Sequence, residues 1–242
     1  MLSSRTSIAM KRTFLCPDIP ERGAALLPPG ESRHLKTVLR AKPGDEIRLV
    51  DGRGRRAMAR FVGLEGTSAR VEILATESAT GGSGPAGHRV GLAAAIPKGA
   101  RADWMIEKCV EAGLDVFFPV LTARGVATAE GASKRARWDR IATEAAKQCG
   151  RATVPELLEP RPLAEVLALT TGWSLRLLAD IAGSGVPATA GDALVFVGPE
   201  GGWDAEERIS LSSLPSVKLG PHILRIETAA VLGVAALAGR YP

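Results

Sequence analysis

The feature that most constrains the fold is a change in the apolar pattern on either side of one glycine-rich segment. Residues 76–88, TESATGGSGPAGH, combine Gly, Ser, Thr and Pro without an apolar period, which is typical of a linker. Short strand-like runs precede this segment, and strands alternating with helices follow it. We therefore expect two domains, residues 1–75 and residues 89–242, joined by a linker at 76–88.

The first domain is expected to be rich in β-structure. Strand-like runs cover residues 46–51, 57–63 and 68–74, and the turn signals DGRG and GLEGT separate them. One helical interruption is expected at residues 31–41, because the apolar period there ends just before a Pro-Gly pair. A small β-domain with one helix follows from this pattern.

The second domain is expected to be an α/β domain with a mostly parallel sheet. The expected strands cover residues 90–96, 116–121, 174–180, 193–198 and 217–220. The expected helices cover residues 102–112 and 134–149, and two more begin at residues 204 and 227. Alternating strands and helices favour a parallel sheet, whose ligands bind at the carboxyl ends of the strands.

Basic side chains are concentrated in the first third of the chain. Residues 1–75 hold 14 Lys and Arg against 8 Asp and Glu, whereas the remainder holds 17 against 18. An excess of this kind favours a polyanionic partner such as RNA, because Lys and Arg that neutralise phosphates release counterions. The alternative is a basic surface with no specific partner.

Several classes of protein are disfavoured by composition. The longest nearly uncharged apolar run, 228–238, is shorter than the roughly 20 residues of a membrane span. The first residues lack the features of a secretory signal, so we expect a cytoplasmic protein without a membrane partner. Three separated cysteines and three scattered histidines form no metal-ligand pattern, and we expect no metal.

A glycine-rich turn after an apolar strand is the first candidate for a ligand site. In ALVFVGPEGGWDAEE, residues 193–207, a buried strand runs into Gly198, Glu200, Gly201 and Gly202, and a helix capped by Asp204 follows. The pattern matches neither GxGxxG nor a phosphate loop ending in GK[ST], which disfavours a dinucleotide or ATP site. The alternative is a tight turn without a ligand.

A second segment, residues 217–239, repeats this design. A strand leads to a Gly-Pro turn, then to Arg225, Glu227 and Thr228, and then to a helix that is apolar almost all round. Such a helix is buried in the core or against a second subunit, and we favour a homodimer interface. Arg225 and Glu227 either form a surface salt bridge or serve function, and their position at a strand end favours function.

A third segment, residues 133–151, contains the helix expected at 134–149 and carries basic side chains on its outer face. They are Lys134, Arg135, Arg137, Arg140 and Lys147. Such a face is either solvated or in contact with RNA, and the spacing alone does not choose between the two.

Taken together, these segments resemble the RsmE family of 16S rRNA (uracil-N3) methyltransferases, a branch of the SPOUT superfamily. The resemblance spans nearly the whole chain. It rests on residues 33–45, 98–120, 144–151, 197–207 and 219–229, whose sequences are RHLKTVLRAKPGD, KGARADWMIEKCVEAGLDVFFPV, EAAKQCGR, VGPEGGWDAEE and LGPHILRIETA. The last two together are the most specific.

The resemblance implies a fold and a cofactor. It implies a small PUA-like β-barrel domain, an α/β SPOUT domain with a trefoil knot, and a homodimer. It also implies that S-adenosyl-L-methionine binds among the knot loops. The residues expected to line that pocket are Leu178, Ala179, Gly198, Glu200, Gly201, Gly202, Leu219, Gly220, Ile223, Leu224 and Thr228.

The implied substrate is 16S rRNA, within the small ribosomal subunit. The residues expected to contact RNA are Arg33, His34, Lys36, Arg40, Arg124 and Arg151. The sequence departs from the family pattern at His222, where Arg is common, and at Ala123 and Gly125, which flank Arg124 in place of a Glu-Arg-Ser motif.

The expected chemistry is an in-line methyl transfer to a uracil imide nitrogen, which must lose its proton first. Arg225 is expected to stabilise charge on a uracil oxygen, and Glu227 to orient that arginine. Three alternatives stay open at this point. They are another RNA methyltransferase of the superfamily, a non-catalytic RNA-binding or ribosome-assembly factor, and an NAD-dependent or nucleotide-hydrolysing α/β enzyme.

Overall fold

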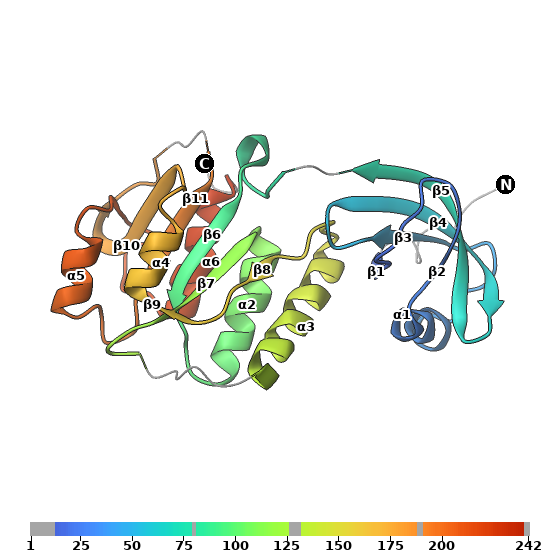
Figure 1. Ribbon diagram of the computed structural model, residues 1–242, viewed down its shortest axis with the longest axis horizontal. Helices are drawn as coiled ribbons and strands as arrows, with labels where there is room; N and C mark the ends of the chain where they lie inside the picture. Colours follow the sequence, from blue (N-terminus) through green and yellow to red (C-terminus); the bar gives the residue numbers. More distant parts are fainter. Residues whose placement is uncertain (1–12, 79–80, 126–131, 188–190, 240–242) are drawn as a thin grey trace. The chain divides into compact units, whose positions relative to one another are not determined.

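The chain folds into two units, each with its own sheet. The computed structural model describes residues 13–78, 81–125, 132–187 and 191–239 (Figure 1). One unit comprises Met1–Thr80 together with Ala146–Val154, and the other comprises Gly81–Ala145 and Pro155–Pro242. The expected division at residues 76–88 differs from this in two details: strand β5 continues to Ser78, and residues 146–154 group with the first unit.

The first unit is built on a five-stranded sheet in the order β1-β3-β4-β5-β2. β1 pairs parallel with β3, and the other pairs are antiparallel. The strands are β1 Thr13–Leu15, β2 Gly23–Leu26, β3 Glu46–Val50, β4 Arg55–Glu65 and β5 Ser68–Ser78. The expected strands at 46–51, 57–63 and 68–74 are confirmed as β3, β4 and β5, whereas β1 and β2 were not predicted.

The helical segment of the first unit is shorter and less regular than expected. Residues 31–41 were expected to form one helix, but α1 covers Pro29–Arg33 and a turn of π-helix, η2, covers His34–Val38. Leu39 donates its N–H to the His34 carbonyl at 3.1 Å, and Arg40 then adopts a positive φ of 51°. A π-turn is frequently found at functional sites.

The core of the first unit follows the alternation of its strands. Ile47 and Leu49 of β3 point inward with Phe61 of β4 and Val71 of β5, and Leu35 of η2 covers them. Alternate positions of a strand face opposite sides of a sheet, so the intervening side chains remain near solvent. The period of two in the sequence thus accounts for this core.

The second unit holds a seven-stranded sheet whose pairs are all parallel (Figure 1). The order is β12-β10-β11-β6-β7-β8, and β9 also pairs with β7. The strands are β6 Val90–Ala95, β7 Val116–Leu121, β8 Glu156–Leu157, β9 Arg161–Pro162, β10 Leu175–Ser184, β11 Ala193–Val197 and β12 Ser216–Val217. The expected parallel sheet is confirmed, and β8 and β9 are additions to it.

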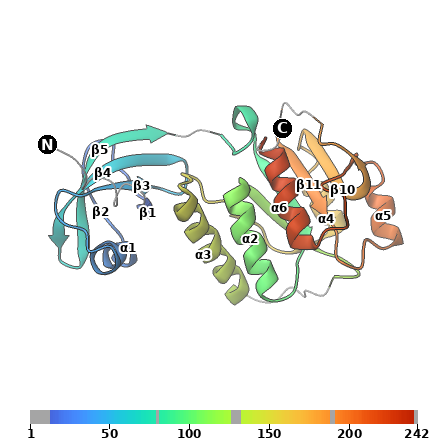
Figure 2. The same ribbon diagram turned by 180° about the vertical axis from the view of Figure 1, so that it is seen from behind.

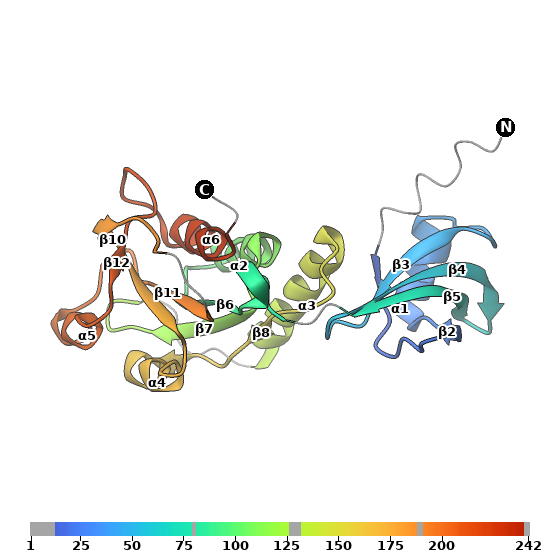
Figure 3. The same ribbon diagram turned by 90° about the horizontal axis from the view of Figure 1, so that it is seen from above.

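Helices cover both faces of this sheet. They are α2 Ala100–Ala112, α3 Ala132–Cys149, α4 Leu163–Leu169, α5 Ala205–Leu211 and α6 Ile226–Leu237, with a short 3-10 turn η3 at Pro85–Gly87. Figure 2 shows α2 and α6 side by side, and Figure 3 shows them on the face opposite α4. The expected helices are confirmed, and α4 was not predicted.

Helix α6 is buried within its own chain. It packs on α2 and on strands β6 and β11, and Ala230, Gly233 and Val234 are fully or almost fully buried. A helix apolar on nearly all sides is thereby accommodated between a second helix and the sheet. Val231, Leu232 and Ala236 remain partly exposed on one side.

No helix in the described ranges is long and apolar enough to cross a membrane.

Candidate active site

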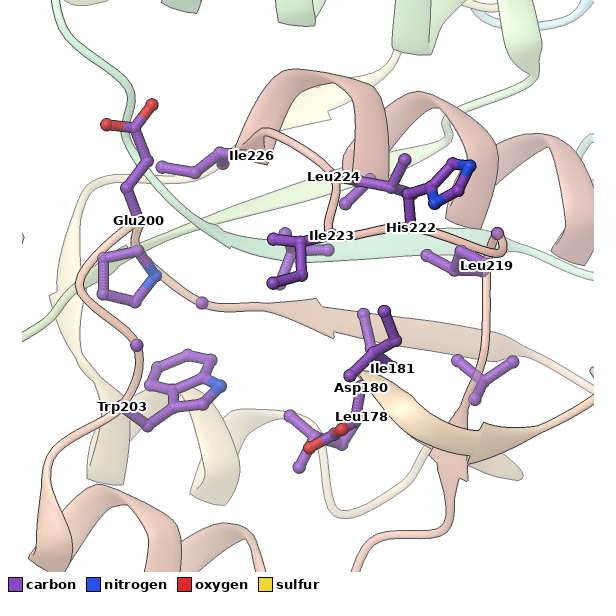
Figure 4. A pocket seen from close by; sticks show the side chains of 18 of the residues that line it. Leu178, Asp180, Ile181, Glu200, Trp203, Leu219, His222, Ile223, Leu224 and Ile226 are labelled. Atoms are coloured by element: carbon purple, nitrogen blue, oxygen red, sulfur yellow. The ribbon is translucent and has the colours of Figure 1, made fainter.

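A cavity of about 490 Å³ opens at the carboxyl ends of β10, β11 and β12 (Figure 4). These three strands are neighbours in the parallel sheet, so the loops that follow them leave the same edge. Figure 4 shows Glu200 and Trp203 along one side, Leu178, Asp180 and Ile181 along another, and the loop from Leu219 to Leu224 opposite. The volume falls within the range of small-molecule sites.

The turn between β11 and α5 forms one wall of the cavity. A Cβ atom on Gly198 would lie 2.7 Å from the Trp203 indole nitrogen, so only glycine lets Trp203 close against this turn. Gly202 has a φ of +71°, in the left-handed region that favours glycine. The turn thus needs glycine at both positions. Both glycines line the cavity, where they leave the backbone accessible.

Helix α5 begins with the Asp204 cap expected from the sequence, and Glu207 completes a capping box. The Asp204 carboxylate accepts the Glu207 N–H at 2.8 Å, and the Glu207 carboxylate accepts the Asp204 N–H at 2.9 Å. Glu207 also accepts the N–H of Ala123 at 2.9 Å. The cap therefore ties the glycine-rich turn to the loop that follows β7.

Strand β10 departs from regular pairing where it reaches the cavity. Leu178 and Ala179 pair with β12, but the next β12 partner along β10 is Ser184. The intervening residues bulge, and Asp180 and Ile181 line the cavity. Asp180 Oδ1 accepts the Ala182 N–H at 2.9 Å, which fixes the carboxylate locally. A bulge of this kind re-aims side chains, as is common beside active sites.

The loop after β12 presents apolar side chains to the cavity. Leu219, Ile223 and Leu224 line it, and Ile223 is 88% exposed (Figure 4). A large apolar side chain this exposed inside a concave site is typical of a surface that a ligand covers. His222 also lines the cavity, in the position where the family pattern commonly has Arg.

Most of the expected cofactor residues come together in this cavity. Those that line it are Leu178, Ala179, Gly198, Glu200, Gly202, Leu219, Gly220, Ile223 and Leu224. Gly201 and Thr228 do not line it: Gly201 accepts a hydrogen bond from Arg124 Nη1 at 2.9 Å, and Thr228 is half-buried on α6. Their binding roles stay predictions.

The two expected catalytic residues lie at the start of α6. Arg225 is exposed and precedes the helix, whereas Glu227 is 7% exposed in its first turn. Oxygen Oε2 of Glu227 is buried without a hydrogen-bond partner among the described residues, so it does not bond to Arg225. The described part of the chain therefore does not show the surface salt bridge considered for Arg225 and Glu227. The catalytic roles of the two residues stay predictions.

The expected RNA-binding residues are divided between the units. Arg33, Lys36 and Arg40 are exposed in the first unit, and His34 is half-buried with its ring 5.9 Å from that of Phe14. Arg151 also belongs to the first unit, where its Nη2 donates to Thr153 Oγ1 at 3.3 Å. Arg124 lies in the second unit, beside the glycine-rich turn.

Several lining residues were not predicted as site residues. They are Asp180, Ile181, Val197, Pro199, Trp203, Arg208, Val217, His222, Ile226 and Ala229. Val197 ends β11, as the strand expected at 193–198 indicated. Val217 ends β12, whereas the sequence predicted that a strand would begin there and run to residue 220. Asp180 and Ile181 depend on the β10 bulge, which no local pattern indicates. In the described part of the chain, no group of His, Cys, Asp or Glu is placed to hold a metal ion.

Comparison with known proteins identifies the class. Residues 85–238 match a family model described as RNA methyltransferase domain, and residues 27–74 match one described as RNA methyltransferase PUA domain. The chain is thus an RNA methyltransferase with an N-terminal PUA domain and a SPOUT-type α/β domain.

Individual relatives narrow this class. Ribosomal RNA small subunit methyltransferase E of Mycobacterium bovis is 33% identical, over 93% of this chain and 90% of that protein. The crystal structure of the protein of the same name from Neisseria gonorrhoeae, bound to S-adenosyl methionine, is 32% identical with a TM-score of 0.81, over 95% of this chain and 98% of the other. A putative methyltransferase from Legionella pneumophila, in complex with the cofactor SAM, is 26% identical with a TM-score of 0.81, over 95% and 98%. The chain belongs to the ribosomal RNA small subunit methyltransferase E family.

Proposed function

We propose that this protein transfers the methyl group of S-adenosylmethionine to N3 of one uridine of 16S rRNA in the small ribosomal subunit. The observation that carries the proposal is the cavity at the carboxyl edge, which gathers nine residues expected to bind the cofactor from three separate segments of the chain. Family membership supports the reaction class, and the resemblance of 197–207 and 219–229 to the RsmE pattern supports the atom methylated. The protein acts in the cytoplasm, where ribosomal subunits assemble.

The cavity fits the methyl donor in size and character. Its volume of about 490 Å³ suits a nucleoside joined to an amino acid, and its walls combine apolar side chains with exposed backbone. The tight approach of Trp203 to Gly198 leaves the turn no room for a larger residue. Leu178 of β10, Gly198 of the turn after β11 and Leu219 of the loop after β12 would hold the donor. When bound, the donor supplies an activated methyl group on a sulfonium.

The acceptor nitrogen needs help to become a nucleophile. In the overall reaction the uracil N3–H bond breaks and its proton passes to solvent, while the methyl–sulfur bond breaks and a methyl–N3 bond forms. Arg225, exposed beside the cavity-lining Leu224, stabilises the negative charge that develops on a uracil oxygen. The unpartnered Oε2 of Glu227 orients this arginine when RNA is bound.

The first unit supplies most of the RNA affinity. Its exposed Arg33, Lys36 and Arg40 lie on or just after the helical segment that ends in the π-turn. The chain holds four Trp, one Tyr and five Phe, and most of the aromatic side chains are buried, so few remain for stacking on bases. Contacts to phosphates therefore dominate binding. Arg124 and Arg151 also contact phosphates of the RNA.

The active form is a homodimer with a trefoil knot. Both cavity loops belong to the segment from β11 to α6, which in the superfamily pattern passes through the knot. The partly exposed stripe of Val231, Leu232 and Ala236 on α6 is apolar and supports a second subunit there. Light scattering on the purified protein tests the dimer.

Transfer of label from S-adenosylmethionine to RNA tests the proposal against its alternatives. Purified protein is titrated with the methyl donor by calorimetry and then incubated with unmethylated small subunits. Binding and transfer to a uridine support the proposal. Binding with transfer to a different nucleoside favours another RNA methyltransferase of the superfamily. Absence of binding favours a non-catalytic RNA-binding factor, and binding of NAD or ATP instead favours the third alternative.

A further inference from the structure

Arg101 lies at the carboxyl edge of the second-unit sheet, in contact with the glycine-rich turn. It is in the first turn of α2, which follows β6, and β6 is the neighbour of β11 in the sheet, with Ala94 opposite Val197. The start of α2 and the glycine-rich turn therefore leave the same edge from adjacent strands. Helix α6, whose first turn holds Glu227, packs on α2.

The guanidinium group of Arg101 is paired with one carboxylate, and its helix packs on the helix that holds a second. Arg101 Nη1 donates to Glu200 Oε1 in an ion pair. The hydrogen bond and the charge of Glu200 raise the pKa of Arg101, and the charge of Glu227 adds to the effect. Arg101 thus lies within the electrostatic reach of a residue that lines the cavity and of a residue at the start of α6.

Stability does not account for this arrangement. The Arg101 and Glu200 side chains are 37% and 55% exposed, and ion pairs with this much solvent contribute little to the free energy of folding. Their local effect is larger, because Glu200 lines the cavity and Glu227 is almost fully buried with Oε2 unpartnered. Without Arg101, the charge of Glu200 would have no ion-pair partner, and that of Glu227 would be offset only by Arg225 once RNA is bound, so this part of the site would be more negative.

Such a charge matters for the proposed reaction, on which this inference rests. Uracil N3 must lose its proton before it attacks the methyl group, so an anionic base has to be held beside the cavity. Like charges disfavour an anion, whereas a positively charged methyl donor is not repelled by carboxylates. Offsetting the negative charges of Glu200 and Glu227 would therefore favour turnover more than it favours binding of the methyl donor.

We propose that Arg101 is a positioning residue that offsets the charges of Glu200 and Glu227, so that the site accepts a uracil anion. It acts through the two carboxylates and not by contact with the reacting atoms. Because the role depends on charge, a lysine at position 101 should support turnover in part. A neutral residue at this position should not support it.

The test compares kcat with the KM for S-adenosylmethionine, using small ribosomal subunits as substrate. Arg101→Gln is expected to lower kcat by about 10- to 100-fold and to change the donor's KM by less than about 3-fold. Arg101→Lys is expected to retain most of kcat. The double variant Arg101→Gln, Glu200→Gln is expected to regain about 5-fold or more of kcat over Arg101→Gln, since it removes one charge of each sign.

Arg161→Gln is the matched control, because it removes a similarly exposed ion pair, to Glu165, from the same unit. Its kcat should match that of the wild type. Melting temperatures are measured for every variant, and Arg101→Met replaces Arg101→Gln if the latter does not fold.

The outcomes separate this inference from the proposed function. Wild-type kcat in Arg101→Gln would overturn the role of Arg101, as would equal losses in the single and double variants together with a lowered melting temperature. A wild-type protein that leaves uridine N3 unmethylated would instead overturn the proposed function itself.

Discussion

At the scale of single residues, Arg225 is the side chain that most directly tests the proposed chemistry. It is exposed, it precedes α6, and it neighbours Leu224 of the cavity without lining the cavity itself. Arg225→Ala is therefore expected to lower kcat by about 100-fold or more, while the Kd for S-adenosylmethionine changes by less than about 3-fold. Single-turnover kinetics and calorimetry measure the two quantities separately.

Arg225→Lys is the control, because it keeps the positive charge and should retain more activity than alanine. Equal losses of turnover and donor affinity in Arg225→Ala would contradict the assigned role, since they would place Arg225 in donor binding.

Residues governed by local chemistry were predictable, and residues governed by distant pairing were not. Gly198, Gly202 and the Asp204 cap follow from the turn between a strand and a helix, and the sequence around them shows that turn. Asp180 enters the cavity only because β10 bulges against β12, some 40 positions along the chain. Likewise, Arg101 and Glu200 are 99 positions apart, and no spacing indicates their ion pair.

At the scale of elements, the two central strands of the second unit are joined at their amino ends by a clamp. Arg89 precedes β6 and Asp192 precedes β11; Asp192 accepts the Arg89 N–H at 2.8 Å and its Nε–H at 2.8 Å. The Arg89 guanidinium also lies 5.0 Å from the Trp173 ring centroid. This clamp holds in register strands β6 and β11, which lead to the helix of Arg101 and to the glycine-rich turn.

The clamp predicts a dependence of stability on pH. Burial tends to raise the pKa of Asp192, but the hydrogen bonds and charge of Arg89 outweigh it and lower that pKa below its usual value. A lowered pKa contributes stability above the unfolded-state pKa, and the contribution is lost as pH falls through the folded-state pKa. Asp192→Asn should therefore lower the free energy of unfolding by roughly 1 kcal/mol at pH 7, and by less below about pH 4.

Denaturant titrations of the wild type and Asp192→Asn, at pH 7 and below about pH 4, measure the change in the free energy of unfolding. Asp139→Asn, which removes an exposed ion pair to Arg135 on α3, should change the free energy of unfolding much less at pH 7. A destabilisation by Asp192→Asn that is the same at both pH values would show that the charge of Asp192 does not act through Arg89.

Elements with a long or strong apolar period were predictable, and short ones were not. Strands β6, β7 and β11 are apolar throughout, and helices α2 and α3 show the helical period over several turns. Helix α4, with seven residues, and the two-residue strands β8 and β9 are fixed by packing against β7. The helix expected at 31–41 is instead α1 followed by a π-turn, in which Leu35 packs into the core of the first unit, and no local pattern indicates that change.

At the scale of the whole molecule, the concentration of positive charge in the first domain predicts how RNA binding responds to salt. If about four phosphates are neutralised, the affinity for 16S rRNA should fall roughly 50-fold or more between 50 and 200 mM salt. Lys36→Gln should weaken binding and reduce the slope of log affinity against log salt by about 1. Filter binding over a salt series measures both.

Glu65→Gln, at the exposed end of β4 in the same unit, is the control and should leave the slope unchanged. Binding that is insensitive to salt would contradict the assignment of RNA affinity to phosphate contacts from this unit.

The division of the chain into two units could be predicted from the sequence only in part. The change of pattern near residues 76–88 indicates two domains, and each has its own sheet. Residues 146–154 nevertheless group with the first unit, where Lys147 pairs with Glu31 at 2.5 Å and Val154 bonds to Gly52. A helical period continues to Cys149 without interruption, so no local signal marks that change.

The central claim is that the cavity at the carboxyl edge serves methyl transfer to uridine N3. Its most direct measurement is nucleoside mass spectrometry of 16S rRNA after purified protein, S-adenosylmethionine and unmethylated small subunits are incubated together. The account predicts one 3-methyluridine per 16S rRNA with the wild-type protein, and almost none with Arg225→Ala. A different methylated nucleoside, or no methylation by a protein that binds the donor, would contradict it.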